Sequence, residues 1–130
     1  MSTVAFLSHP VSAGFPSPAA DYLEQSLDLH RYLITNTPAT VLARVQGDSM
    51  MQAGIHDHDI VIIDRSLQPM HNQIVVGALD GGLIVKYWQQ FDGRTILHAA
   101  NDQYADIVLT AASDFLLWGV VTGVVRKLVP

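Results

Sequence analysis

A serine and a lysine are the residues of this chain whose types could support covalent chemistry. Ser49 lies in Gly47-Asp48-Ser49-Met50, and Lys86 lies in the apolar run 83–88. A serine hydroxyl is a weak nucleophile at neutral pH unless a base lies beside it, and an unprotonated lysine can be that base. The pair fits two interpretations: a Ser-Lys catalytic dyad, or a turn serine with an exposed strand lysine whose ammonium stays in water.

The pattern around Lys86 favours a partly buried lysine. If the run 83–88 is a strand, then Ile84, Lys86 and Trp88 point to the same face. Apolar neighbours on that face would remove water from the ammonium group, which lowers the pKa of a lysine. A lowered pKa is the condition for a lysine to act as a general base near pH 7. Lys127 is the only other lysine in the chain.

Two other groups of polar residues fit ordinary structural roles better than chemistry. A Ser-His-Asp triad is disfavoured because Ser49 is followed by two methionines, and not by the x-Gly of a nucleophile elbow. The alternating run His56-Asp57-His58-Asp59 resembles a metal site, but it follows Gly54 and is predicted to be a solvated turn. Asp57 and Asp59 are expected to shape this turn by accepting backbone N–H bonds. Arg126-Lys127 is interpreted as solvated surface.

Composition limits the classes of protein to which the chain can belong. Its 130 residues suffice for one domain with its own core, and 49% of them are hydrophobic while 15% are charged. The absence of cysteine excludes disulfides and thiol nucleophiles, and it fits a cytoplasmic protein. A net charge of −5 without a basic stripe predicts no direct DNA binding. No targeting segment or membrane-spanning run is visible, so no membrane association is expected.

The elements that must position Ser49 and Lys86 are predicted to be mostly β. Residues 1–25 are expected to form an extended N-terminal arm, because three of the six prolines lie in residues 1–20. Residues 26–130 would form a strongly bent antiparallel β domain with at most short helices, one at 26–34 and one turn after Ser49. Asp80-Gly81 and Asp92-Gly93 predict hairpin turns. Gly119 and Gly123 predict bends or bulges. The expected strands are 40–45, 60–64, 73–79, 82–91, 95–99, 107–109 and 115–129.

Three stretches in a fixed order resemble one protein family. They are the segment 13–22, the serine segment 47–64 and Ile84-Val85-Lys86, followed by Trp118-Gly119-Val120-Val121. Together they resemble the LexA/UmuD family of Ser-Lys self-cleaving proteins, and in particular its UmuD-type members, which serve error-prone DNA polymerases. The resemblance covers nearly the whole chain from Val11 onward. It implies a dimeric β domain of the LexA C-terminal type.

The resemblance also assigns roles to individual residues. Ser49 matches the nucleophile, Lys86 the general base, and Ala13-Gly14 the self-cleaved bond, with Val11 as an apolar anchor before it. Asp48 and Met50 are expected to support the cleft and the oxyanion. No cofactor and no metal are implied. About a dozen residues precede the matched bond, fewer than UmuD-type proteins are expected to have, and no helix-turn-helix segment precedes the arm, so a repressor role is disfavoured.

The resulting hypothesis is a cytoplasmic UmuD-like protein of the bacterial SOS response. The resemblance implies a homodimer, self-cleavage stimulated by a RecA–single-stranded DNA filament, and a trimmed form that assists a UmuC-like Y-family polymerase in translesion synthesis. Two alternatives stay open from the sequence. One is an interaction module of the same fold that is never cut, and the other is a Ser-Lys peptidase that acts on other chains.

Overall fold

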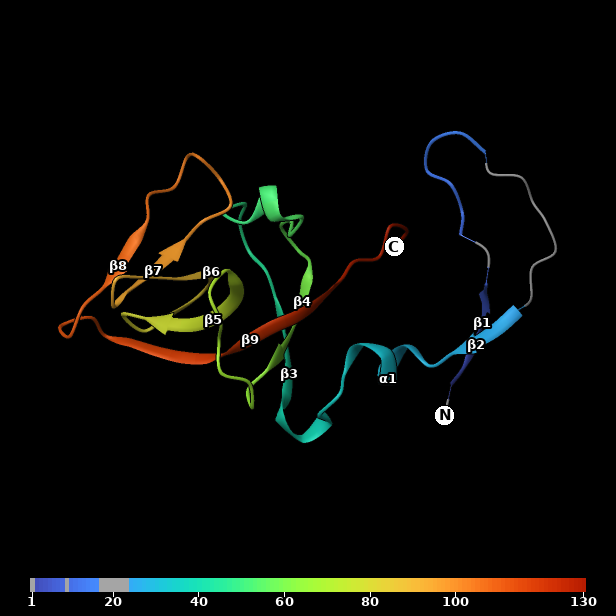
Figure 1. Ribbon diagram of the computed structural model, residues 1–130, viewed down its shortest axis with the longest axis horizontal. Coiled ribbons are helices and arrows are strands. Elements are labelled where there is room, and N and C mark those ends of the chain that lie inside the picture. The colour runs from blue at the N-terminus through green and yellow to red at the C-terminus, as the bar shows by residue number, and fades with distance from the viewer. Residues whose placement is uncertain (1, 9, 17–23) are drawn as a thin grey trace. The chain divides into compact units, whose positions relative to one another are not determined.

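The computed structural model describes residues 2–8, 10–16 and 24–130 (Figure 1). The chain forms two compact units, residues 1–35 and residues 36–130, and each is described by itself. The boundary between these units lies beyond residue 25, where the sequence predicts that the arm ends. The predicted division into an arm and a β domain stays a prediction.

The first unit contains a short two-stranded ladder. Strand β1 (Val4–Leu7) pairs antiparallel with β2 (Glu24–Leu27), so that Val4 lies opposite Leu27. The sequence predicted an extended arm here and did not predict this pairing; the residues of β1 are extended and exposed. Helix α1 (Leu29–Leu33) is shorter than the predicted 26–34, because residues up to Leu27 belong to β2. Asp28 caps it by accepting a 3.2 Å bond from the backbone N–H of Arg31.

The second unit is a seven-stranded sheet whose neighbouring strands are all antiparallel. The spatial order is β3-β4-β9-β5-β6-β7-β8. Its helical elements are two short 3₁₀ helices, η1 and η2, so the predicted fold class, mostly antiparallel β with short helices, is confirmed. The bounds are η1 (Thr37–Ala39), β3 (Thr40–Arg44), η2 (Met51–Ala53), β4 (Ile60–Asp64), β5 (Gln73–Leu79), β6 (Gly82–Phe91), β7 (Arg94–His98), β8 (Ile107–Leu109) and β9 (Phe115–Val125).

The two predicted hairpins are confirmed. Asp80-Gly81 joins β5 to β6, and Asp92-Gly93 joins β6 to β7. All four turn residues have positive φ angles, between 48° and 85°. Positive φ at both central positions is typical of the type I′ turn, whose twist matches that of the flanking strands. These turns fix the register of β6, the strand that carries Lys86.

Strand β9 holds the two halves of the sheet together. It pairs with β5 along its first half and with β4 along its second half (Figure 1). The register shifts once in each ladder, beside Gly119 and beside Gly123, so the predicted bulges are confirmed. A Cβ atom on Gly119 would lie 2.7 Å from the backbone oxygen of Asp64, which leaves room only for glycine. The strand ends at Val125, and not at the predicted residue 129.

The core of this unit consists of two hydrophobic clusters, one of which includes the serine segment. Met50 and Ile55 are each 1% exposed and pack there with β4 and β5. Because these two side chains lie in the core on either side of η2, they fix the path of the backbone that carries Ser49. The first cluster comprises Val45, Met50, Ile55, Val61, Ile63, Val76 and Ala100, and the second comprises Val75, Leu97 and Val120.

Candidate active site

Ser49 and Lys86 line one cleft of about 340 Å³. Ser49 comes from the turn between β3 and η2, and Lys86 comes from β6. The two residues are 37 positions apart in the chain (86 − 49 = 37), and the fold brings them to one cleft. The other lining residues are largely apolar: Ala43, Arg44, Val45, Gln46, Val61, Val76, Leu83, Ile84 and Val85.

The backbone around Ser49 is shaped by a turn on one side and a short helix on the other. Gly47 has a φ of +95°, a conformation that favours glycine, and its N–H donates a 2.8 Å bond to Asp57 Oδ1. The next residues lead through half-buried Ser49 into η2, which is the helical turn that the sequence predicted after the serine. Within the described part of the chain, the backbone N–H groups of Ser49 and Met50 make no hydrogen bond. They are therefore available as donors.

Lys86 is buried, as its position on the strand predicted. It lies opposite Val75 in the β5–β6 ladder and is 8% exposed. Burial lowers the pKa of its ammonium below the ordinary lysine value, because the charged form loses water. Among the described residues no carboxylate forms an ion pair with Lys86. Its Nζ lies 5.1 Å from the ring centroid of Tyr104, within the range of a cation–π contact.

The loop 99–106, between β7 and β8, holds the serine turn through four hydrogen bonds. The Tyr104 hydroxyl donates to Asp48 Oδ1 at 2.7 Å, and Asn101 Nδ2 donates to the Asp48 backbone oxygen at 2.9 Å. The Gln52 N–H donates to the Ala100 oxygen at 2.8 Å, and the Ala100 N–H contacts the sulfur of Met50 at 3.4 Å. The bond to the carboxylate raises the pKa of the Tyr104 phenol. This loop was not predicted to be part of the site, because its residues indicate only a turn.

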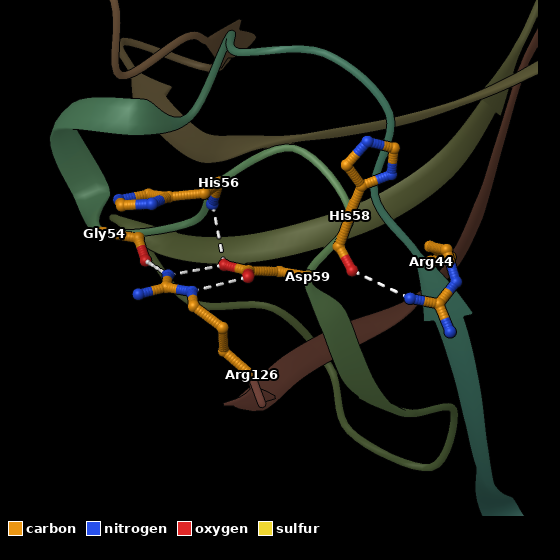
Figure 2. Close-up of polar contacts among 6 residues, drawn as sticks. All are labelled: Arg44, Gly54, His56, His58, Asp59 and Arg126. Carbon is orange, nitrogen blue, oxygen red and sulfur yellow. Dashed lines mark hydrogen bonds and ion pairs between the residues drawn. The ribbon is translucent and has the colours of Figure 1, made fainter. Parts of the chain in front are cut away.

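A partly buried ion pair supports the far end of the serine segment. Asp59 is 2% exposed, and both of its oxygens lie 2.6 Å from nitrogens of the Arg126 guanidinium. Arg126 also donates to the Gly54 oxygen at 2.8 Å, and Asp59 accepts a 2.7 Å bond from the His56 N–H (Figure 2). The pKa of Asp59 falls to about 2, chiefly because of the hydrogen bond from Arg126. The interpretation of Asp59 as a solvated turn residue is therefore wrong, because its carboxylate is buried. Arg126 lies at the surface, as the sequence indicated, but its guanidinium is paired with Asp59.

The other residues of the turn 56–59 and Lys127 lie at the surface, as the sequence indicated. Asp57 and Asp59 both accept backbone N–H bonds in their turn, and His56 and His58 are exposed. In residues 2–8, 10–16 and 24–130, no three His, Asp or Glu side chains are grouped so that they could hold a metal ion. Within the same residues, no histidine lines the cleft. Lys127 is exposed.

The predicted cleavage-site residues lie in the first unit. Val11, Ala13 and Gly14 are all exposed, and the Gly14 N–H donates a 3.2 Å bond to Ser12 Oγ. A Cβ atom added at Gly14 would meet no atom within 4 Å. The peptide bond between Ala13 and Gly14 therefore lies in a segment without close packing.

Comparison with known proteins identifies the family. The peptidase S24-like family matches residues 5–122. The chain belongs to the peptidase S24-like family. It is 37% identical to Protein SamA of Salmonella typhimurium over 97% of this chain and 87% of the relative. It is 38% identical to Protein ImpA of Escherichia coli over 88% and 78%, and 36% identical to Protein MucA of Escherichia coli over 92% and 82%.

These matches confirm the predicted resemblance to the LexA/UmuD family and its UmuD-type members. LexA repressor 1 of Xanthomonas oryzae pv. oryzae is also 38% identical, over 90% of this chain and 58% of the relative. The chain is a UmuD-like member of the S24 family. Membership of this family makes it, at the family level, a self-cleaving serine peptidase. None of the helices in the described residues has the length and apolar character needed to cross a membrane.

Proposed function

We propose that this UmuD-like SOS protein cleaves its own Ala13-Gly14 bond with a Ser-Lys dyad. Ser49 acts as the nucleophile and Lys86 as the general base. The observation that carries the proposal is that both residues line one cleft, and that Lys86 is buried there without an acidic partner among the described residues. Burial lowers the pKa of Lys86, so more of its amine is neutral near pH 7. The neutral amine is the form that can accept a proton from Ser49.

The reaction proceeds in two steps through an ester. Neutral Lys86 takes the proton of Ser49 Oγ while that oxygen attacks the carbonyl carbon of Ala13. The bond from Ala13 to Gly14 breaks, the Gly14 nitrogen takes the proton from Lys86, and Ala13 remains esterified to Ser49. Water then attacks the ester and gives a proton to Lys86, which passes it to Ser49 Oγ. The free N–H groups of Ser49 and Met50 would stabilise the negative oxygen in both steps.

Substitution of each member of the dyad tests the proposal. Ser49→Ala and Lys86→Ala should each lower the cleavage rate at least about 1,000-fold while the fold is kept. Cleavage is measured by mass spectrometry of purified protein after incubation at alkaline pH, where a product of residues 14–130 is expected. Replacement of any single histidine should leave cleavage intact. A correctly folded histidine variant that cannot cleave would contradict the dyad.

The pH dependence identifies the base. Because the active species needs neutral Lys86, the cleavage rate should rise with pH, with a midpoint below the pKa of a free lysine, about 10.4. Lys86→Arg keeps the charge but cannot lose its proton in this range, so it should be inactive even at high pH. Lys127→Arg is the matched control and should cleave normally. Cleavage by Lys86→Arg with a rising pH profile would show that another group is the base.

Membership of the S24 family and similarity to UmuD-type proteins support a role for the trimmed chain in translesion synthesis. In this proposal the chain is a cytoplasmic homodimer, a RecA–single-stranded DNA filament stimulates cleavage, and residues 14–130 bind a UmuC-like polymerase. The test compares the full and trimmed chains for co-sedimentation with such a polymerase.

An intact chain at every pH would favour the non-cleaving interaction module. Cleavage of an added inactive chain would indicate action on other chains.

A further inference from the structure

We infer that Tyr104 is a positioning residue of this site, holding the serine turn through its hydroxyl and Lys86 through its ring. The inference rests on the proposed Ser-Lys function and extends it to a residue outside the dyad. One side chain contacts both halves of the site: its hydroxyl donates to Asp48 Oδ1 at 2.7 Å, and its ring centroid lies 5.1 Å from Lys86 Nζ. Asp48 directly precedes Ser49 in the chain.

The backbone around Tyr104 is held in a fixed conformation. Its N–H donates to the Asn101 oxygen at 3.1 Å, and the Gln103 N–H donates to Asn101 Oδ1 at 2.9 Å, which closes a turn. Asn101 is itself bonded to the backbone of Asp48 through its side-chain amide, at 2.9 Å. The tyrosine therefore approaches the serine turn from a loop that is already fastened to the same turn.

The bond between Tyr104 and Asp48 sets the direction of the serine turn. A charge-assisted hydrogen bond is stronger and more directional than a neutral one, and a displacement of about 1 Å in a reacting group can cost about 100-fold in rate. Loss of this bond should therefore change how often Ser49 Oγ points at Lys86. The bond also gives the Asp48 side chain a structural role in the cleft.

The ring of Tyr104 acts on the charge of Lys86. When Lys86 takes the proton of Ser49, a positive charge forms on Nζ, and an aromatic face stabilises such a charge. Burial acts in the opposite direction by disfavouring the ammonium. Arg44 lines the same cleft as Lys86, and the carboxylate of Asp48 accepts the bond from the Tyr104 hydroxyl.

Two substitutions at Tyr104 separate the hydroxyl from the ring. Tyr104→Phe keeps the ring and removes the bond to Asp48, so cleavage should slow about 10-fold with the pH midpoint unchanged. Tyr104→Leu keeps apolar cover over Lys86 but removes the aromatic face, so the pKa of Lys86 should drop, and the rate at pH values above the midpoint, where Lys86 is already neutral, should fall further. Tyr87→Phe, which removes a hydroxyl from the neighbouring position on β6, is the matched control and should match the wild type.

The experiment measures the pKa of Lys86 by NMR titration in the full chain, alongside the cleavage rate and the melting temperature. A lower pKa in Tyr104→Leu and an unchanged pKa in Tyr104→Phe, with wild-type melting temperatures, support the inference. Equal pKa values of Lys86 in all three proteins overturn it, whether or not the wild type cleaves. Absence of cleavage in the wild type, by contrast, counts against the proposed function. The titration would still show whether the ring of Tyr104 changes the pKa of Lys86.

A double-mutant cycle tests the hydroxyl. Tyr104→Phe and Asp48→Ala break the same bond, so the double variant should cleave no more slowly than the slower single variant. If their effects on the rate multiply, Tyr104 does not act through Asp48 and that half of the inference is wrong.

Discussion

The two units of the chain differ in how their residues are packed. In residues 36–130, two hydrophobic clusters contain side chains that are almost entirely excluded from solvent. In the described part of residues 1–35, every classified side chain is exposed or half-buried, and the paired backbone is a ladder of four residues on each strand. Val11 and Phe15, on either side of the proposed cleavage site, are 83% and 92% exposed. The proposed substrate is thus loosely packed, and the proposed catalyst is built on a rigid core.

The largest difference should appear in hydrogen exchange. Amides of Ile60–Ile63, in β4, which is paired on both sides by β3 and β9, should exchange only through global unfolding. Amides of residues 2–8 and 10–16 should exchange through local opening, because few buried contacts hold them. For a typical domain the two free energies of opening should differ by several kcal/mol, up to about 5–15. Equal, strong protection of both segments, measured by mass spectrometry on the Ser49→Ala chain, would contradict the comparison.

Truncation of one apolar side chain in each unit should give a smaller but clear difference. Ile63→Ala removes a side chain that is 1% exposed in the first cluster, and it should lower the free energy of unfolding by about 2–5 kcal/mol. Leu7→Ala, in β1, is the matched variant. Leu7 is 44% exposed, so the change in the unfolding of residues 36–130 should stay within about 0.5 kcal/mol. Urea denaturation measures both values, and a large effect of Leu7→Ala would show that the first unit stabilises the second.

The same contrast explains which features the sequence revealed. Local signals predicted the hairpins at Asp80-Gly81 and Asp92-Gly93 and the burial of Lys86, because turn chemistry and strand alternation act over a few residues. Contacts between distant residues were not predictable in this way. Asp59 and Arg126 are 67 positions apart, and Tyr104 and Asp48 are 56 positions apart. The strand β1 was also missed, because its pairing with β2 spans the proline-containing segment.

The smallest expected effect concerns the ion pair behind the serine segment and its dependence on pH. The pKa of Asp59 is about 2 in the folded chain, lower than its ordinary value of 3.8, so the folded state binds this proton less tightly than the unfolded state. The stabilisation is therefore complete above the unfolded pKa, and it is lost as the pH falls from about 5 to 2. The ion pair contributes at most about 2 kcal/mol to the free energy of unfolding. The contribution is smaller than this limit because solvent reaches the Arg126 side of the pair.

Thermal melting between pH 7 and pH 2 measures this contribution in three proteins. In Arg126→Leu the carboxylate loses its partner, so stability at pH 7 should fall, and burial should raise the pKa of Asp59. The acid-dependent loss of stability that Asp59 contributes should then diminish. Asp114→Asn is the control, because Asp114 is an exposed acid that is distant from Asp59 in the sequence. This variant should keep both the wild-type stability and its pH profile. If Arg126→Leu loses stability by the same amount at pH 7 and at pH 2, packing of the Arg126 side chain, and not its charge, supports this end of the serine segment.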